Sequence, residues 1–305
     1  MAKAAARPPE SPPPVVEELH FKSESAFLCL LLNRRIGLIR VIDFRAGALP
    51  AKRLFIQNVA RRNGIEKVLL LVEKDEVSSW TRVGFVREGT IPGFYKRSDG
   101  HLVGCVIGEK TASVEVDDEG QKLAERTINA AKKNAREIAE TLPSVTTAIA
   151  DEVDALAARD EVWRKSHGLS GFDAFGRDAQ RYYVESTTRK GRTNYLSAEY
   201  QDCFGHSLVE ILRSPTDDLD VLALTGGLRF LSEDLKERGI VSAFGLGASD
   251  DIGLATAYVA AGFRKTGLLA NGVAVPATNG KGGGSARKDA ILWTRKLANP
   301  AGDEE

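Results

Sequence analysis

The sequence is poor in the residues that build disulfide frameworks and metal centres. It contains three cysteines, Cys29, Cys105 and Cys203, and four histidines in 305 residues. An odd, widely spaced set of cysteines is more typical of buried thiols in a reducing compartment than of a disulfide framework. The histidines show no spacing that suggests a zinc site. We therefore expect a cytoplasmic protein without a bound metal.

An excess of one charge and long hydrophobic segments are also missing. Lysine plus arginine equals aspartate plus glutamate, at 42 residues each, whereas a nucleic-acid-binding protein normally carries a basic excess. The strongest apolar run, residues 26–32, has the length of a buried strand, far below the roughly 18 residues that span a bilayer. We expect neither nucleic acid nor membrane as a partner. Residues 1–14 should form a disordered Pro-rich tail, and residues 299–305 a second tail.

The first part of the chain alternates between strand and helix patterns. Two apolar strands lie within residues 26–44, and residues 49–65 carry apolar side chains at helical spacing. The continuous apolar run at 67–73 predicts a strand that is buried on both faces. A short helix is expected at 75–83 and a further strand at 102–107. This order is typical of an α/β layer and not of a helical bundle.

The middle of the chain is predicted to be helical. Small and apolar residues step by three and four along residues 119–142, which indicates an amphipathic helix. Pro143 ends this pattern, and Ser144 is a candidate N-cap for a second helix. Val145, Ile149 and the residues that follow would then continue a buried stripe. We expect helices over 119–165.

The last part of the chain repeats the Gly-Ile and Gly-Phe pairs of the first part. Gly64-Ile65 and Gly84-Phe85 lie 20 residues apart, and Gly239-Ile240 and Gly262-Phe263 lie 23 apart. Each pair follows a helical pattern and precedes a strand pattern. This spacing predicts two copies of one α/β unit. We assign residues 15–110 to the first half and 111–298 to the second domain, whose sheet core would span 180–298.

Two phrases resemble a known enzyme superfamily. The helix phrase "ATAYVAAGF" at 255–263 is similar to the "A-x-x-x-Y-x-x-x-G-F" helix of the acetyl-CoA-dependent N-acetyltransferases (GNAT). The phrase "GTIPGFY" at 89–95 resembles the degenerate first half of the β-lysine N-acetyltransferase family, and the strands near the C-terminus are also similar. The resemblance implies an α/β fold of tandem GNAT-like units, each with a mixed central sheet flanked by helices.

The resemblance also implies a reaction and a set of site residues. In such enzymes an amine attacks the thioester of acetyl-CoA, a base removes a proton from the amine, and an acid protonates the leaving thiolate. Tyr258 would be the acid and Glu210 the base, with Glu199 as the second choice. An alternative for Tyr258 is a core residue whose hydroxyl lies at a rim. The residues expected to bind acetyl-CoA are Gly226, Gly227, Arg229 and Asp251.

One segment departs from the superfamily pattern. A basic, Gly-rich loop normally binds the pyrophosphate of CoA at the start of a helix, whereas residues 217–224 here contain three aspartates. Carboxylates beside a pyrophosphate would repel it. Two hypotheses therefore stay open. One is a cytoplasmic N-acetyltransferase for a small, lysine-like amine, and the other is a catalytically inactive GNAT-fold module for binding, scaffolding or regulation. The partner is a small amine or a protein, and a homodimer is possible.

Overall fold

The computed structural model describes residues 13–22, 27–42, 49–108, 114–141, 144–166, 168–201, 204–276 and 285–298. The predicted tails, at 1–14 and 299–305, lie almost wholly outside these ranges. Within the described ranges, no helix is long and apolar enough to cross a membrane.

The N-terminal half contains six strands and two helices in its described residues. In chain order they are β1(Val16–Lys22), β2(Phe27–Asn33), β3(Leu38–Val41), α1(Leu49–Arg62), β4(Lys67–Val72), α2(Lys74–Arg82), β5(Val86–Ile91) and β6(Gly100–Val106). The sheet order is β1-β2-β3-β4-β6-β5. The predicted strands and helices of this half are confirmed. β1 was not predicted, because its sequence VEELHFK alternates with charged residues, as an edge strand does.

The C-terminal half begins with a long helix and continues with seven strands and three helices among the described residues. They are α3(Asp118–Thr141), β7(Val145–Ala150), α4(Glu152–Ser166), β8(Gln180–Thr188), β9(Thr193–Tyr200), β10(His206–Ile211), α5(Asp218–Glu237), β11(Ser242–Ala248), α6(Ile252–Ala260), β12(Arg264–Pro276) and β13(Ser285–Lys296). The sheet order is β12-β13-β11-β10-β9-β8-β7.

The prediction of a second helix that begins at Ser144 is wrong over residues 145–150, which form β7, whereas α4 follows at Glu152. Residues 145–150 pair antiparallel with β8 and form the outer strand of the sheet. The sequence VTTAIA is rich in β-branched residues, which favour a strand over a helix once a pairing edge is present. Ile149 and Val153, expected in a buried stripe, are both exposed.

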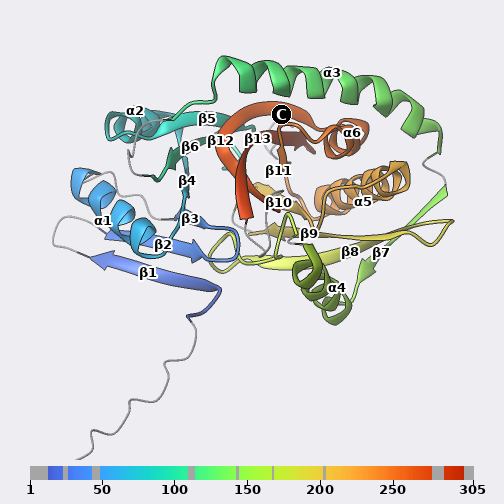
Figure 1. The fold of residues 1–305 in the computed structure, drawn as a ribbon, viewed down its shortest axis with the longest axis horizontal. Helices are drawn as coiled ribbons and strands as arrows, with labels where there is room; N and C mark the ends of the chain where they lie inside the picture. Colours follow the sequence, from blue (N-terminus) through green and yellow to red (C-terminus); the bar gives the residue numbers. More distant parts are fainter. Residues whose placement is uncertain are drawn as a thin grey trace, which may run out of the picture.

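The described residues of the two halves form one sheet of 13 strands, and the strand order repeats from its two ends (Figure 1). In the first half, β3 and β4 are parallel neighbours connected through α1. In the second half, β10 and β11 are parallel neighbours connected through α5. Each half ends in an antiparallel pair, β5 with β6 and β12 with β13. This mixed sheet with helices on its faces confirms the predicted α/β class.

Among the described residues, three large clusters of buried apolar residues hold the fold together, and a small fourth cluster packs α4 on β8. One packs α1 and α2 on the N-terminal strands, with Trp80 fully buried. A second packs α3, α5 and α6 on the C-terminal strands. The third joins the halves, because Leu69 and Phe94 of the first pack with Phe244 and Leu292 of the second. In Figure 1, α3 extends along the top of the molecule above α6, against which it packs.

A buried ion pair lies where the halves meet. Lys67 of β4 donates from Nζ to Glu88 Oε1 at 2.6 Å and to the carbonyl oxygen of Ala270 in β12 at 2.7 Å. The same Glu88 oxygen accepts from the Ala270 amide at 3.1 Å. Burial lowers the pKa of Lys67 and raises the pKa of Glu88. Gly104 leaves the space for this pair, since a Cβ there would collide with the Glu88 carboxylate.

The phrase IPGFY forms a second contact between the halves. Phe94 stacks on His206 of β10, with ring centroids 3.5 Å apart and planes 10° from parallel. Its carbonyl oxygen lies 3.1 Å from His206 Nδ1 and accepts from the Gly205 amide at 3.2 Å. Burial, with the charge of Arg40 as the second cause, lowers the pKa of His206 to about 3.

This histidine should make the protein sensitive to acid. The unfolded chain takes up a proton near pH 6.5 and the folded chain only near pH 3, so stability is lost as pH falls through this window. Between pH 7 and pH 4, His206 should account for about 3 kcal/mol of lost stability. Urea unfolding of wild type and His206→Phe at both pH values measures this loss, with the exposed His20→Gln as control. An equal acid loss in wild type and His206→Phe would contradict the assignment.

Candidate functional site

The parallel strands β10 and β11 diverge in the middle of the C-terminal half. Both strands are described in full, and their pairing covers only His206–Leu208 against Ser242–Phe244. β10 continues to Ile211 and β11 to Ala248 without further pairing to each other. Backbone amide and carbonyl groups in the gap can therefore bind an extended ligand, as an exposed strand edge does.

Tyr258 lies at this gap. Its ring, on α6, is fully buried and stacks on Trp293, with centroids 5.5 Å apart and planes 12° from parallel. Its hydroxyl reaches the sheet because β11 has glycine at position 245, where a Cβ would collide with that hydroxyl and lie 2.8 Å from the Val209 carbonyl oxygen of β10. Burial raises the pKa of Tyr258 well above its ordinary value, with the charge of Glu210 as a smaller cause. The neutral phenol can donate a proton or a hydrogen bond into the gap.

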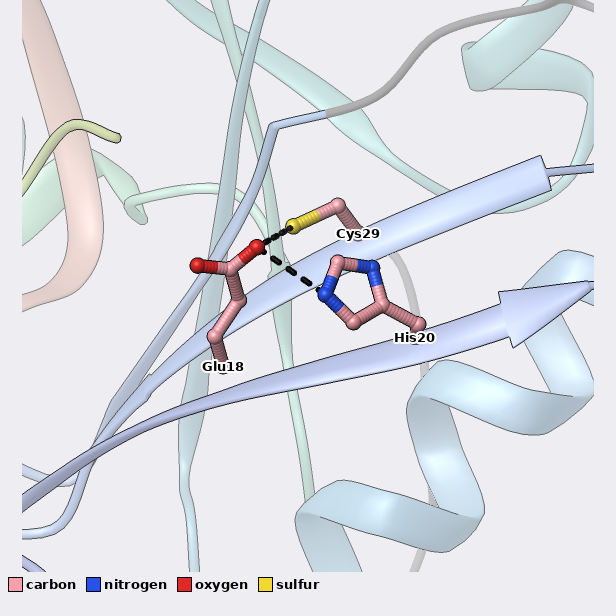
Figure 2. A group of neighbouring side chains, drawn as sticks. All are labelled: Glu18, His20 and Cys29. Atoms are coloured by element: carbon pink, nitrogen blue, oxygen red, sulfur yellow. Dashed lines mark hydrogen bonds and ion pairs between the residues drawn. The ribbon is translucent and has the colours of Figure 1, made fainter. Parts of the chain in front are cut away.

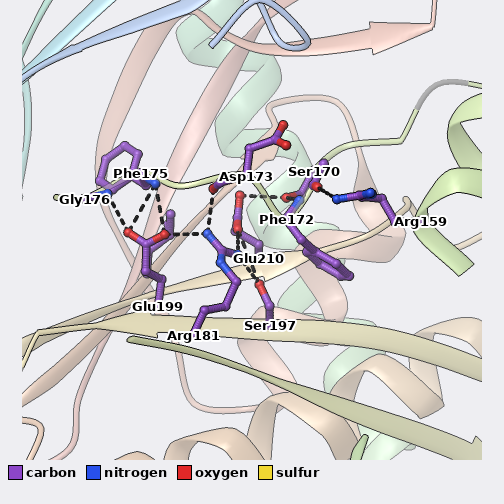
Figure 3. Close-up of polar contacts among 12 residues, drawn as sticks. Arg159, Ser170, Phe172, Asp173, Phe175, Gly176, Arg181, Ser197, Glu199 and Glu210 are labelled. Atoms are coloured by element: carbon purple, nitrogen blue, oxygen red, sulfur yellow. Dashed lines mark hydrogen bonds and ion pairs between the residues drawn. The ribbon is translucent and has the colours of Figure 1, made fainter. Parts of the chain in front are cut away.

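The two candidate bases share one arginine (Figure 3). Arg181 of β8 donates from Nη1 to Glu210 and from Nη2 to Glu199, the latter at 2.5 Å. Glu210 also accepts from the hydroxyls of Ser170 at 2.6 Å and Ser197 at 3.3 Å. Burial lowers the pKa of Arg181, but the charges of Glu210 and Glu199 outweigh it, so the pKa is raised overall.

These contacts limit what the carboxylates can do. Glu199 accepts the amides of Phe175 at 2.9 Å and Gly176 at 2.6 Å, so it fixes the loop before β8. Glu210 is bound by a permanent cation and two hydroxyl donors, so its oxygens are already engaged within the protein. The network therefore fits a structural role for Glu199 and leaves Glu210 as a carboxylate held at the edge of a cavity.

That cavity lies between the two halves and is small. Its volume is about 80 Å³, and Ile36 and Leu38 of the first half line it opposite Leu208 and Phe244 of the second. Glu210 is among its polar lining residues. A water molecule takes up about 30 Å³ of the liquid, so the space suits a few waters better than a lysine side chain with its backbone. Apolar side chains of the N-terminal half thus close this cavity beside Glu210.

A larger pocket opens at the N-termini of α5 and α6. Its volume is about 790 Å³, and its lining includes Glu137 of α3, Asp217 and Asp218 of α5, and Ile252 of α6, with no lysine or arginine among the described residues that line it. Asp217 caps α5 by accepting the Asp220 amide at 2.9 Å. This hydrogen bond is the main cause that lowers the pKa of Asp217, so its carboxylate stays charged.

This pocket does not fit the pyrophosphate of CoA. The Asp220 amide at the start of α5 is already bound to Asp217, and the Asp220 carboxylate accepts the Thr216 amide at 3.0 Å and the Thr216 hydroxyl at 2.7 Å. Arg192, the cation nearest to Asp217, is engaged with that carboxylate at 2.6 Å. Carboxylates at the position where phosphate oxygens would lie cost binding energy by like-charge repulsion. The described residues that line this pocket therefore offer no cation to the pyrophosphate of the cofactor that the sequence phrases imply.

The glycines predicted to bind the cofactor lie elsewhere. Gly226 and Gly227 are buried in the middle of α5, where a Cβ would come within 2.7 Å of Val145 and within 2.5 Å of Leu196. Their role in a phosphate loop is therefore wrong. The helix begins at Asp218, about two turns before these glycines, and the glycines let it pack closely on the sheet.

The other two predicted cofactor residues serve α6. Arg229 is exposed and donates to the Ala260 carbonyl oxygen at 2.7 Å, at the C-terminal end of that helix. Asp251 is the N-cap of α6 and accepts the Leu254 amide at 2.8 Å. Burial raises the pKa of Asp251. Neither lines the large pocket.

Sequence reasoning missed the residues that connect the site. Arg181 begins an ordinary strand pattern, and nothing in its neighbourhood indicates that two carboxylates lie beside it. Gly245 offered a weak signal, because a glycine inside a strand often marks a close approach of another group.

Comparisons with known proteins reach only the level of fold. No family model and no curated protein sequence matches the chain. Among solved structures, the chain is similar to the ribosomal-protein-S18-alanine N-acetyltransferase from Escherichia coli, with TM-score 0.37 and 18% identity over 53% of this chain and 98% of that one. A spermidine/spermine N-acetyltransferase from Vibrio cholerae gives 0.36 and 11%, over 51% and 94%. The protein yncA from Salmonella typhimurium, solved with acetyl-CoA, gives 0.36 and 14%, over 53% and 98%.

Proposed function

We propose that the protein is a GNAT-fold binding module that holds a small cationic amine and does not take up acetyl-CoA. In this proposal residues 15–110 and 111–298 are two GNAT-like units, the first degenerate and the second carrying the ligand. The acid-lined pocket at the start of α5 is the observation that carries the proposal. The location of the protein in the cytoplasm and its possible assembly as a homodimer stay predictions.

The charge of the large pocket supports an amine as ligand. Three carboxylates, those of Glu137, Asp217 and Asp218, line it, and the hydroxyls of Thr216 and Thr256 add polar partners. An ammonium group gains energy from the charges that repel a pyrophosphate. A volume of about 790 Å³ accommodates lysine or a polyamine.

The state of the candidate bases supports the absence of catalysis. An N-acetyltransferase needs a group that accepts a proton from the attacking amine. Arg181 occupies both Glu199 and Glu210, and the cavity beside Glu210 has a volume of only about 80 Å³. An amine substrate does not have the room beside Glu210 that such a transfer requires.

Calorimetric titration tests the proposal directly. We expect no binding of acetyl-CoA or CoA at about 1 mM, and saturable binding of spermidine or lysine. The double variant Asp217→Asn, Asp218→Asn keeps a capping side chain and should weaken amine binding about tenfold, because two partly exposed charge interactions are lost. Asp75→Asn, in the first turn of α2, is the matched control. Saturable, salt-sensitive binding of acetyl-CoA to wild type would overturn the proposal.

A second candidate function is N-acetylation of the same amine, and the position of Tyr258 favours it. The hydroxyl meets the gap between β10 and β11 where Gly245 leaves space, as a proton donor to a thiolate would. Under this candidate, Tyr258→Phe should slow turnover about a hundredfold or more while the fold persists. A coupled assay of thiol release with wild type decides between the candidates, since the binding module shows no release above background.

A further inference from the structure

Three side chains with metal-ligand atoms meet on the hairpin of β1 and β2. His20 of β1 and Cys29 of β2 are direct partners in the antiparallel register. Glu18 lies two residues before His20 and therefore points to the same face. Figure 2 shows the three side chains turned toward one another. Leu19 and Phe21, which alternate with them, pack on the core cluster under α1.

The distances suit a single small cation. His20 Nε2 lies 3.0 Å from Glu18 Oε1, and the Cys29 thiol donates to the same oxygen at 3.4 Å. The three ligand atoms all lie within 4.8 Å of one another. Bonds of about 2.0–2.3 Å to a tetrahedral zinc ion place its ligand atoms about 3.3–3.8 Å apart. A small adjustment of two exposed side chains therefore brings all three atoms to bonding distance.

We propose that Glu18, His20 and Cys29 form a zinc-binding site, with a water molecule as the fourth ligand. Carboxylate, imidazole and thiolate together are a donor set that favours zinc over magnesium or calcium, which prefer oxygen ligands alone. The sulfur sits at the buried base of the site, and Cys29 is 1% exposed. The side chains of His20 and Glu18 are 44% and 33% exposed, so the metal enters from solvent.

A neighbouring arginine competes with the metal. Arg177 Nε lies 3.1 Å from Glu18 Oε1, so this cation occupies the oxygen that also contacts the other two ligand atoms. Zinc binding must displace Arg177 from Glu18. Removing the positive charge should therefore tighten binding. The hairpin is the outer edge of the sheet, and the metal would clamp its first strand to the second.

Cobalt and zinc titrations of the full, untagged chain test the site. We expect one Co²⁺ per chain, with a thiolate-to-cobalt absorption band in the near ultraviolet that zinc abolishes. Cys29→Ser should remove the band, whereas Cys105→Ser and Cys203→Ser should keep it. His20→Gln and Glu18→Gln should each weaken Zn²⁺ binding at least about tenfold, and Arg177→Gln should strengthen it. A band that survives Cys29→Ser or disappears in Cys203→Ser would place the metal elsewhere.

The dependence of the melting temperature on zinc concentration provides a second test, which does not require the Cys29→Ser variant to fold. Zinc bound to the folded chain alone raises its melting temperature with concentration. Wild type and Cys105→Ser should show this rise, and the surface variant Glu18→Gln, which leaves the buried thiol intact, should show little of it. Equal rises in wild type and Glu18→Gln, or no rise in wild type at about 100 µM zinc, would refute the site.

Discussion

Replacing Lys67 by methionine is expected to lower the free energy of unfolding by about 3–5 kcal/mol, because it leaves the buried carboxylate of Glu88 without its cation. Lys67 is fully buried, and its ammonium connects Glu88 to the Ala270 carbonyl of β12. The loss therefore falls on the contact between the two halves. Urea unfolding followed by far-ultraviolet circular dichroism gives the value, with the slope showing whether the transition stays two-state.

A double variant separates the two contributions. Lys67→Met with Glu88→Leu removes both charges and should recover most of the lost stability, since apolar pairs of similar volume often replace buried ion pairs without cost. Lys165→Met breaks the exposed pair with Glu161 and should change the free energy of unfolding far less than Lys67→Met does. A loss below 1 kcal/mol in Lys67→Met would mean that solvent reaches Glu88 in the folded protein.

The second large effect is expected from Arg181→Met. The variant leaves two carboxylates, Glu199 and Glu210, facing each other without the guanidinium between them. Repulsion and lost hydrogen bonds should lower the free energy of unfolding by about 3–5 kcal/mol. The damage should be local as well, because the loop before β8 depends on Glu199 for the amides of Phe175 and Gly176.

Hydrogen exchange distinguishes this local effect from general destabilisation. Wild type and Arg181→Met are compared at denaturant concentrations that give them equal free energies of unfolding. Under these conditions the amides of residues 172–176 should exchange faster in the variant, whereas those of β4 should not. Arg181→Lys keeps one charge but cannot contact both carboxylates in the same geometry, so it should recover only part of the loss. A uniform increase in exchange across both halves would contradict the proposed role in the loop.

The repeated order of helices and strands could be predicted because the glycines that end the helices have one physical cause. Gly64, Gly84, Gly239 and Gly262 all adopt positive φ, between 65° and 90°, directly after helices. Only glycine takes this conformation at little cost, so each of these helix ends requires a glycine at the same position. Continuous apolar runs such as β4 are equally explicit, since both faces of the strand are covered. β7 could not be predicted in this way, because the sequence of an outer strand can also fit a helical pattern until a pairing edge is known.

The candidate site could be predicted only in part. Tyr258 is a prediction from a recognisable phrase, and the acidic start of α5 is visible in the sequence as a cluster of aspartates. Gly226 and Gly227 were misassigned, because the family pattern places glycines before a helix, whereas α5 already begins at Asp218. Arg181 depends on contacts between strands, and the pairing of His20 with Cys29 depends on register. Neither the contacts of Arg181 nor the pairing of His20 with Cys29 can be predicted from local sequence.

The shared sheet also bears on how the chain could be divided. β5 and β12 meet at Gly89 and Gly267, whose missing side chains let the two backbones approach. A gene cut between β6 and α3 would give two fragments, each with a bare inner strand and one open apolar face. Expressed separately, such pieces should aggregate or pair with copies of themselves. Expressed together, they should find each other and restore the whole, which makes the molecule a candidate for split-protein complementation.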